Sequence, residues 1–265
     1  DGRESPSGRS LTGDLTSQAN DAILGHQQAA NPPSAATLAA IVQFETSLYT
    51  AQIKGFGVGR LNRAGATGGP APLLTLPFFT GINNLDAQGQ PQSPDVFQLY
   101  DAWTASDVPE RAAIARGEAI FNRRVIQITG VAGLNDALGL PVIAGACSTC
   151  HNTPSVGDHS VPGPLDIGVA DASQRTPDLP LFTVNCDNGA TVKTTDLGRA
   201  LITGKCADIG KFKGPILRGL AARAPYFHNG SAATLLEVVN FYNTRFNLGL
   251  SQQEKSDLVA FLQSL

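Results

Sequence analysis

The chain has 265 residues and a formal net charge of -3, and this length allows one large domain or two of ordinary size. Hydrophobic residues make up 42% and charged residues 15%, without an apolar run near the roughly 20 residues of a membrane span, which argues against a membrane channel and a disordered chain. No basic run follows one face, so nucleic acid is not an expected partner. Methionine is absent and the first residue is Asp1, so we expect a processed or trimmed form.

The first half of the chain predicts short helices. Residues 34–49 repeat apolar side chains at helical spacing, and Ser34 is a candidate N-cap. A short helix is expected over residues 95–103. A further helix is expected over residues 107–122, with an acidic cap and a proline in its first turn.

The second half predicts the same kind of structure, with a domain boundary near Ser106. Residues 145–151 are expected to form a helical turn, and residues 158–180 a long loop. Helices are expected over residues 195–202, 231–242 and 251–264, the last of which begins with capping-box spacing. The predicted fold class is mostly α, with long loops.

One pentapeptide carries the predicted chemistry. The sequence Cys147-Ser148-Thr149-Cys150-His151 has the C-x-x-C-H spacing of a c-type haem attachment site. Two thiols three positions apart lie on one side of a helical turn, where they can add to the two vinyl groups of haem. The next residue, His151, is then placed to ligate the iron as the proximal ligand. The helices expected over 107–122 and 251–265 resemble the packing helices of a cytochrome c core.

Two other interpretations of these cysteines stay open. Cys147 and Cys150 would be half of a zinc site if Cys186 and Cys206 completed it, or they would be a redox-active dithiol. Neither interpretation explains His151. Cys186 and Cys206 are better explained as a disulfide, because closing a loop of about 20 residues contributes on the order of 3 kcal/mol. Disulfides and attached haem both fit the periplasm or the cell exterior.

Three further segments carry a family resemblance. They are Thr195-Asp196-Leu197-Gly198-Arg199-Ala200, Gly210-Lys211-Phe212-Lys213-Gly214-Pro215-Ile216-Leu217-Arg218 and Ala224-Pro225-Tyr226-Phe227-His228-Asn229-Gly230-Ser231. In order and spacing, they resemble the C-terminal haem domain of bacterial di-haem cytochrome c peroxidases and of their relative MauG. The resemblance implies a cytochrome c-like helical domain with one covalent haem over residues 107–265. Residues 1–106 would be the remainder of an N-terminal cytochrome c-like domain.

The start of the chain resembles the same family. Asp1-Gly2-Arg3-Glu4 is similar to the segment that follows the Trp of Trp-Asp-Gly-Arg in the family's N-terminal haem domain. In the family, the first C-x-x-C-H lies upstream of that point. The resemblance implies that this chain lacks its first haem-attachment segment and that the full-length protein carries a second haem. The alternative is a natural mono-haem protein that begins at Asp1.

The resemblance also implies a sixth ligand for the iron. The peroxidases take a Met from the helix after the Tyr-Phe-His motif, whereas this chain has Tyr242 at that place, as MauG has a Tyr. A phenolate stabilises ferric iron, so His/Tyr ligation implies a low potential. Two alternatives stay open: Tyr242 is a buried tyrosine bonded to a propionate or to backbone, or His228 is the ligand.

Two loop cations and one loop histidine complete this domain. Arg218 and Lys213 are candidate partners for the haem propionates, although exposed cations on a loop are usually solvated. His159 is expected to be solvent-facing or structural.

The family's peroxidatic pocket implies residues near the start of the chain. Gln18 matches the pocket Gln by its Gln-Ala context, and Gln28 falls at the position of the pocket Glu. Because Gln does not transfer protons as a carboxylate does, the usual acid/base route is in doubt, and His26 is the candidate substitute. The family's calcium is held by backbone carbonyls near Arg223 and Pro225, so side chains there say little about it.

The resemblance implies a periplasmic or secreted haem redox protein. It would use peroxide or oxygen and exchange electrons with a small redox protein. Loss of the Met and the Glu favours MauG-like oxidation of an organic or protein substrate over peroxide reduction. The alternative function is a non-catalytic electron-transfer cytochrome c. The expected assemblies are a homodimer or association with the missing N-terminal segment.

Overall fold

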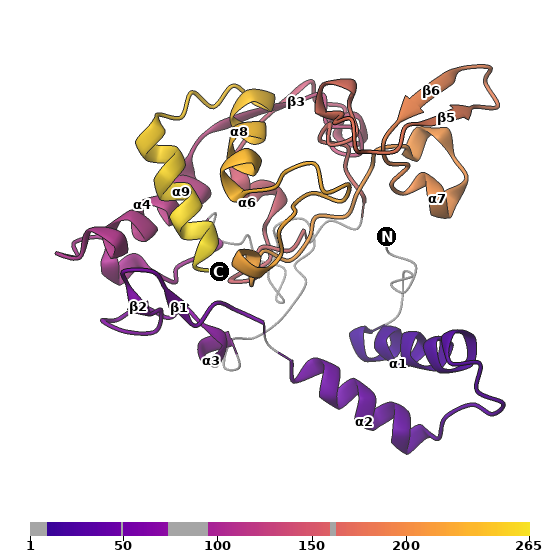
Figure 1. Cartoon of the computed structure of the whole chain (residues 1–265), viewed down its shortest axis with the longest axis horizontal. Coiled ribbons are helices and arrows are strands. Elements are labelled where there is room, and N and C mark those ends of the chain that lie inside the picture. The colour runs from indigo at the N-terminus through magenta and orange to yellow at the C-terminus, as the bar shows by residue number, and fades with distance from the viewer. Residues whose placement is uncertain (1–9, 49, 74–94, 160–162) are drawn as a thin grey trace. The chain divides into compact units, whose positions relative to one another are not determined.

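The computed structural model describes residues 10–48, 50–73, 95–159 and 163–265 (Figure 1). The chain divides into two compact units, Asp1–Thr50 and Ala51–Leu265. The resemblance at the start of the chain, Asp1 to Glu4, lies outside the described residues. No helix within the described ranges is long and apolar enough to cross a membrane.

The first unit contains two helices, α1 (Leu11–Asp21) and α2 (Ala35–Thr46). The hydroxyl of Ser34 accepts the backbone N–H of Thr37 at 3.1 Å, which confirms the predicted N-cap. A π-helical turn, Ala22–His26, extends α1. Val42 is the buried residue of α2, and the apolar face expected on this helix is otherwise largely exposed within the unit.

The second unit is built on two helices that are distant in sequence, α4 (Pro109–Arg123) and α9 (Gln252–Gln263). Their backbones approach closely at Gly117, where a Cβ atom would clash with the carbonyl group of Asp257. Arg116 adds a bidentate ion pair to the Asp257 carboxylate, with N–O distances of 2.7 and 2.8 Å. The crossing therefore depends on one glycine and one charge pair.

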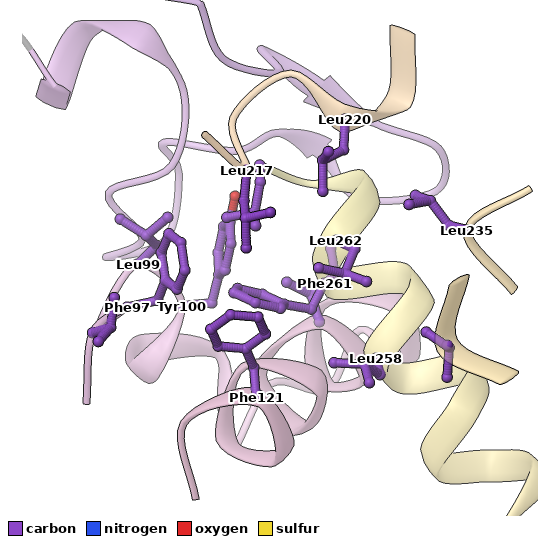
Figure 2. Packing of buried hydrophobic residues seen from close by; sticks show 14 of the residues in the cluster. Phe97, Leu99, Tyr100, Phe121, Leu217, Leu220, Leu235, Leu258, Phe261 and Leu262 are labelled. Atoms are coloured by element: carbon purple, nitrogen blue, oxygen red, sulfur yellow. The ribbon is translucent and has the colours of Figure 1, made fainter. Parts of the chain in front are cut away.

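Aromatic side chains fill the core of this unit (Figure 2). Phe97 lies edge-on to Phe121 and to Phe261, with ring centroids 5.4 Å apart in both pairs. The hydroxyl of Tyr100 donates to the carbonyl oxygen of Ser264 at 2.7 Å, near the end of the chain. These contacts hold residues 97–100 against α4 and α9.

The short helix expected over residues 95–103 is reduced to a 3-10 turn, Asp101–Trp103. Buried side chains of α4 take the backbone groups that a helix would have used. Glu118 accepts the N–H groups of Leu99 and Tyr100 at 2.6 and 2.8 Å. Asn122 bonds both the N–H and the carbonyl of Phe97, at 3.3 and 2.7 Å. Residues 95–100 are therefore irregular rather than helical.

The predicted helix over 107–122 is confirmed as α4, and the two C-terminal helices are also confirmed. α8 (Leu235–Arg245) and α9 both begin with capping boxes, at Thr234 with Glu237 and at Ser251 with Glu254. The helix expected over 195–202 covers only α7 (Ala200–Thr203). It is shorter because Asp196 and Thr194 bond neighbouring backbone groups instead.

Antiparallel hairpins and short helices connect these elements. The hairpins pair β1 with β2, β3 with β4 and β5 with β6. Their strands are β1 (Lys54–Gly55), β2 (Gly59–Arg60), β3 (Ile126–Thr129), β4 (Val142–Gly145), β5 (Phe182–Asn185) and β6 (Thr191–Thr194). The short helices are α3 (Pro70–Leu73), α5 (Asn135–Leu138) and α6 (Cys147–Cys150). The fold is mostly α with long loops, as predicted.

The compact second unit begins at Ala51, well before the domain boundary expected near Ser106. The indole N–H of Trp103 donates to the carbonyl of Arg63 at 3.0 Å, and the N–H of Gln52 donates to the carbonyl of Leu265 at 2.9 Å. Described residues on both sides of Ser106 thus share one core. The assignment of residues 1–106 to an N-terminal haem domain stays a prediction about family architecture.

Candidate functional site

The C-x-x-C-H segment forms the predicted helical turn, α6, directly after β4. The hydroxyl of Thr149 accepts the N–H of Ala146 at 2.9 Å, which starts the turn. The hydroxyl of Ser148 donates to the carbonyl of Asn122 at 3.2 Å, which fixes α6 to the end of α4. Cys147 and Cys150 are both free thiols that pack against the aromatic core.

Burial controls the protonation of these thiols. It raises the pKa of Cys147 to about 12 and the pKa of Cys150 to about 11. Both thiols are therefore protonated at neutral pH. A redox-active C-x-x-C dithiol needs a lowered pKa at its attacking cysteine, so this environment does not fit the dithiol interpretation.

The remaining cysteines are bonded to each other. Cys186 and Cys206 form a disulfide with an S–S distance of 1.99 Å, which joins the end of β5 to the segment after α7. They cannot complete a zinc site with Cys147 and Cys150. Within the part of the chain that the structure describes, no group of three or more His, Cys, Asp or Glu side chains is arranged to hold a metal ion.

His151 follows α6 and is held by the loop after it. Its backbone N–H donates to the carbonyl of Cys147 at 3.0 Å, and its Nδ1 lies 3.0 Å from the carbonyl oxygen of Gly157. A carbonyl only accepts, so Nδ1 carries the proton and Nε2 carries a free lone pair. Burial lowers the pKa of His151 to about 4, which keeps the ring neutral. A neutral imidazole oriented through Nδ1 is the usual state of a metal-ligating histidine.

Tyr242 lies on α8 among aromatic rings. Its ring is 5.3 Å from that of Phe241 and 6.3 Å from those of Phe227 and Phe246. Burial raises the pKa of Tyr242, and the nearby thiols of Cys150 and Cys147 raise it further. Tyr242, Cys147 and Cys150 all pack against the same core cluster.

The rival ligand, His228, has another partner. Its Nδ1 lies 2.5 Å from a carboxylate oxygen of Asp196, and its ring lies 4.8 Å from that of Phe212. The His228 side chain is 61% exposed. Tyr242 therefore packs against the same core as the two thiols, whereas His228 is exposed and paired with Asp196.

His159 is buried, so of its two expected roles, solvent-facing or structural, the structural one holds. It is 3% exposed, and its Nδ1 is bonded to the carbonyl of Cys150 at 2.7 Å. This bond links the loop after His151 back to α6, which is the structural role that the sequence left open. Its Nε2 is buried without a hydrogen-bond partner among the described residues.

The two candidate propionate partners differ. Lys213 is paired with Asp158, with an N–O distance of 3.0 Å, and also bonds the carbonyl of His159 at 3.3 Å. Arg218 is 2% exposed, so the expectation of a solvated loop cation fails for it. Its burial was missed because no local pattern in residues 210–218 marks an inward-facing cation.

The candidate pocket residues of the second haem lie in the first unit. Gln18 is partly buried on α1 beside the buried Ala19, and His26 is exposed at the end of the π-helical turn. Gln28 is exposed and has a positive φ of 53°. Their proposed roles depend on residues beyond this unit and stay predictions.

Comparisons with known proteins agree with the site. Residues 211–248 match a family model described as RoxA-like, cytochrome c-like. Cytochrome-c peroxidase IdrP1 of Denitromonas iodatirespirans is 32% identical over 188 residues, 63% of this chain and 44% of that protein. IdrP2 of the same organism is 40% identical over 133 residues, 46% of this chain and 36% of that protein. The chain is thus similar to bacterial cytochrome c peroxidases over part of its length.

The similarity to cytochrome c peroxidases and to a cytochrome c-like family model supports haem c as the cofactor. A further peroxidase relative, cytochrome c551 peroxidase of Nitrosomonas europaea, is 33% identical over 120 residues, 45% of this chain and 30% of that protein. The chain spans less than half the length of these curated relatives. A solved MauG-like protein associated with microbial copper homeostasis aligns with a TM-score of 0.42 at 22% identity, over 92% of this chain and 56% of that chain.

Proposed function

We propose that Cys147 and Cys150 attach a haem c group and that His151 is its proximal ligand. The observation that carries this proposal is the bond from His151 Nδ1 to Gly157, which leaves the lone pair of Nε2 free in the residue directly after the second of two free cysteines. In the attachment, the sulfur of each thiol would bond to one carbon of a vinyl group and its hydrogen would pass to the other, so no oxidant would be needed.

We propose Tyr242 as the distal ligand. Its hydroxyl pKa is raised, first by burial and then by the two thiols. To ligate as a phenolate, Tyr242 would release one proton, and the positive charge of ferric iron would offset the burial that otherwise opposes ionisation. An anionic oxygen donor stabilises the ferric state, so this site would have a low potential.

The proposed activity is oxidation chemistry driven by peroxide or oxygen, with a small redox protein exchanging electrons. The bound haem would supply the one-electron chemistry. If His151 and Tyr242 both hold the haem, this site would suit an electron relay rather than peroxide binding. Gln18 and His26 would serve the pocket of a second haem. Calcium near Arg223 and Pro225 stays a prediction of the family resemblance.

The periplasm is the proposed location. The Cys186–Cys206 disulfide supports it, since disulfides persist in oxidising compartments. Covalent haem attachment through Cys147 and Cys150 would fit the same compartment.

A non-catalytic electron-transfer cytochrome is the second candidate, because His151 and Tyr242 would together hold the haem without leaving a place for a substrate. Redox titration with electron paramagnetic resonance separates the two functions. A potential well below zero together with a high-spin second haem that reacts with peroxide supports the enzyme. A single low-spin haem inert to peroxide supports the carrier.

A further inference from the structure

Arg218 is a buried cation whose charge is not balanced within the described part of the chain. Its side chain is 2% exposed, and Nη2 donates to the carbonyl of Gly69 at 3.1 Å. Nε and Nη1 are buried and have no hydrogen-bond partner among the described residues. A buried charge without a counter-charge is strongly unfavourable, so this guanidinium needs an anion that the described residues do not supply.

The groups around Arg218 do not supply that anion. The titratable group that acts on it is Tyr100, whose hydroxyl already donates to the carbonyl of Ser264. Burial raises the pKa of Tyr100 to about 12, so this phenol is neutral at physiological pH. Burial lowers the pKa of Arg218 to about 10, which still leaves the guanidinium charged at neutral pH.

The backbone next to Arg218 contacts the loop that follows His151. The N–H of the preceding residue, Leu217, donates to the carbonyl of Val156 at 3.0 Å. The next residue, Gly157, presents its own carbonyl to His151 at 3.0 Å. Leu217 also packs against Gly157, where a Cβ atom would lie 2.9 Å from Leu217 Cδ1. Arg218 therefore directly follows, in sequence, a residue that contacts the loop orienting His151.

We propose that Arg218 binds a carboxylate of the haem, one of its propionates, through Nε and Nη1. The inference rests on the proposed function, because it needs haem at α6. Nε and one Nη of a guanidinium form a planar fork that matches the two oxygens of a carboxylate. Lys213, the other candidate for this role, is already paired with Asp158. A free anion, chloride or phosphate, would satisfy the same fork, and the experiment below separates the two sources.

The test uses the haem-loaded full chain with Arg218→Gln, Arg218→Lys and the control Arg63→Gln, which removes an exposed cation from the same unit. The midpoint potential and the propionate bending band in the resonance Raman spectrum are measured between about pH 5 and pH 8. The background titration of Glu118, whose pKa is about 7, is common to all variants and cancels on comparison.

Arg218→Gln is expected to move the Raman band and to lower the potential, because losing a cation beside the propionate favours ferric iron. The ferric-to-ferrous ratio should shift about tenfold at fixed potential, or about 59 mV for one electron. The unpaired propionate would then titrate within this range and add a pH dependence that wild type lacks. Arg218→Lys should give a smaller shift, and it keeps the test available if Arg218→Gln does not fold.

Two results would overturn the inference. One is an Arg218→Gln protein with the Raman band and pH profile of Arg63→Gln. The other is a wild-type melting temperature that rises with added chloride or phosphate and loses this response in Arg218→Gln, with the propionate band unchanged. A pyridine haemochrome assay on wild type keeps the two proposals separate. Absence of covalent haem contradicts the proposed function, whereas attached haem with an inert Arg218 contradicts this inference alone.

Discussion

Gly157 presents its carbonyl oxygen to Nδ1 of His151 at 3.0 Å, and only glycine fits at this position. Its φ is +71°, and a Cβ atom there would lie 2.9 Å from both Leu217 Cδ1 and Phe97 Cζ. Both the backbone conformation and the core packing therefore favour glycine at position 157, whose carbonyl orients the imidazole of His151.

Gly157→Ala is expected to destabilise the protein by about 2 to 4 kcal/mol, since left-handed strain and overpacking act together. It should also disturb ligation by His151, visible as a change in the haem absorption spectrum. Gly139→Ala is the matched control, because Gly139 has a φ of +65° and open space around its Cβ position. Its cost should be only the strain, about 1 kcal/mol. Equal losses in chemical denaturation would refute the packing argument.

Tyr242→Phe tests the distal ligand. Removing the phenolate should raise the midpoint potential, abolish the phenolate-to-iron charge-transfer absorption of the ferric protein and open a position for cyanide. Tyr226→Phe is the control, since the Tyr226 hydroxyl donates to the carbonyl of Leu220 at 2.9 Å. If Tyr242→Phe left the spectrum and the potential as in the control, Tyr242 would not be a ligand.

Asn122→Ala is expected to destabilise the protein by about 2 to 4 kcal/mol. The change leaves both backbone groups of the buried Phe97 without their side-chain partner. Gln127→Ala removes a side chain from an exposed position of β3 and should change the free energy of unfolding by less than about 0.5 kcal/mol. Urea titrations of both variants check the difference, and a similar small effect for Asn122→Ala would count against the role assigned to this side chain.

The stability of the protein should depend on pH through Glu118. Burial raises its pKa from 4.5 to about 7, although two backbone N–H bonds favour the charged form. A raised carboxyl pKa contributes stability that is fully present below pH 4.5 and is lost as pH rises through about 7. Relative to Glu118→Gln, which does not titrate, the wild-type free energy of unfolding should fall by about 3 kcal/mol over this window. Parallel pH profiles for the two proteins would disprove the shift.

Locally determined features could be predicted from the sequence. The capping box formed by Ser251 and Glu254 depends on residues within a few positions of each other, and so does the C-x-x-C-H turn. Such features form wherever the surrounding chain permits a helix. The Ser34 cap of α2 belongs to the same class.

Features that depend on distant partners could not be predicted. Residues 95–100 are not helical because Glu118 and Asn122 of α4 take their backbone groups. A lone cation in a Gly-rich segment gives no sign that the fold buries it, so the sequence left open whether Arg218 is a propionate partner or a solvated cation. Glu118 carries one usable signal, since it is a polar residue on the apolar stripe that also contains Ile114 and Phe121.

The intact mass and the pyridine haemochrome spectrum of purified protein test the central claim most directly. The protein is produced in a host that attaches c-type haem, together with a Cys147→Ala/Cys150→Ala variant. The account predicts that wild type carries haem that survives denaturation and that this variant loses one haem from its mass. Wild-type protein whose mass is that of the polypeptide alone, or a variant that keeps the same covalent haem content, would contradict attachment at α6.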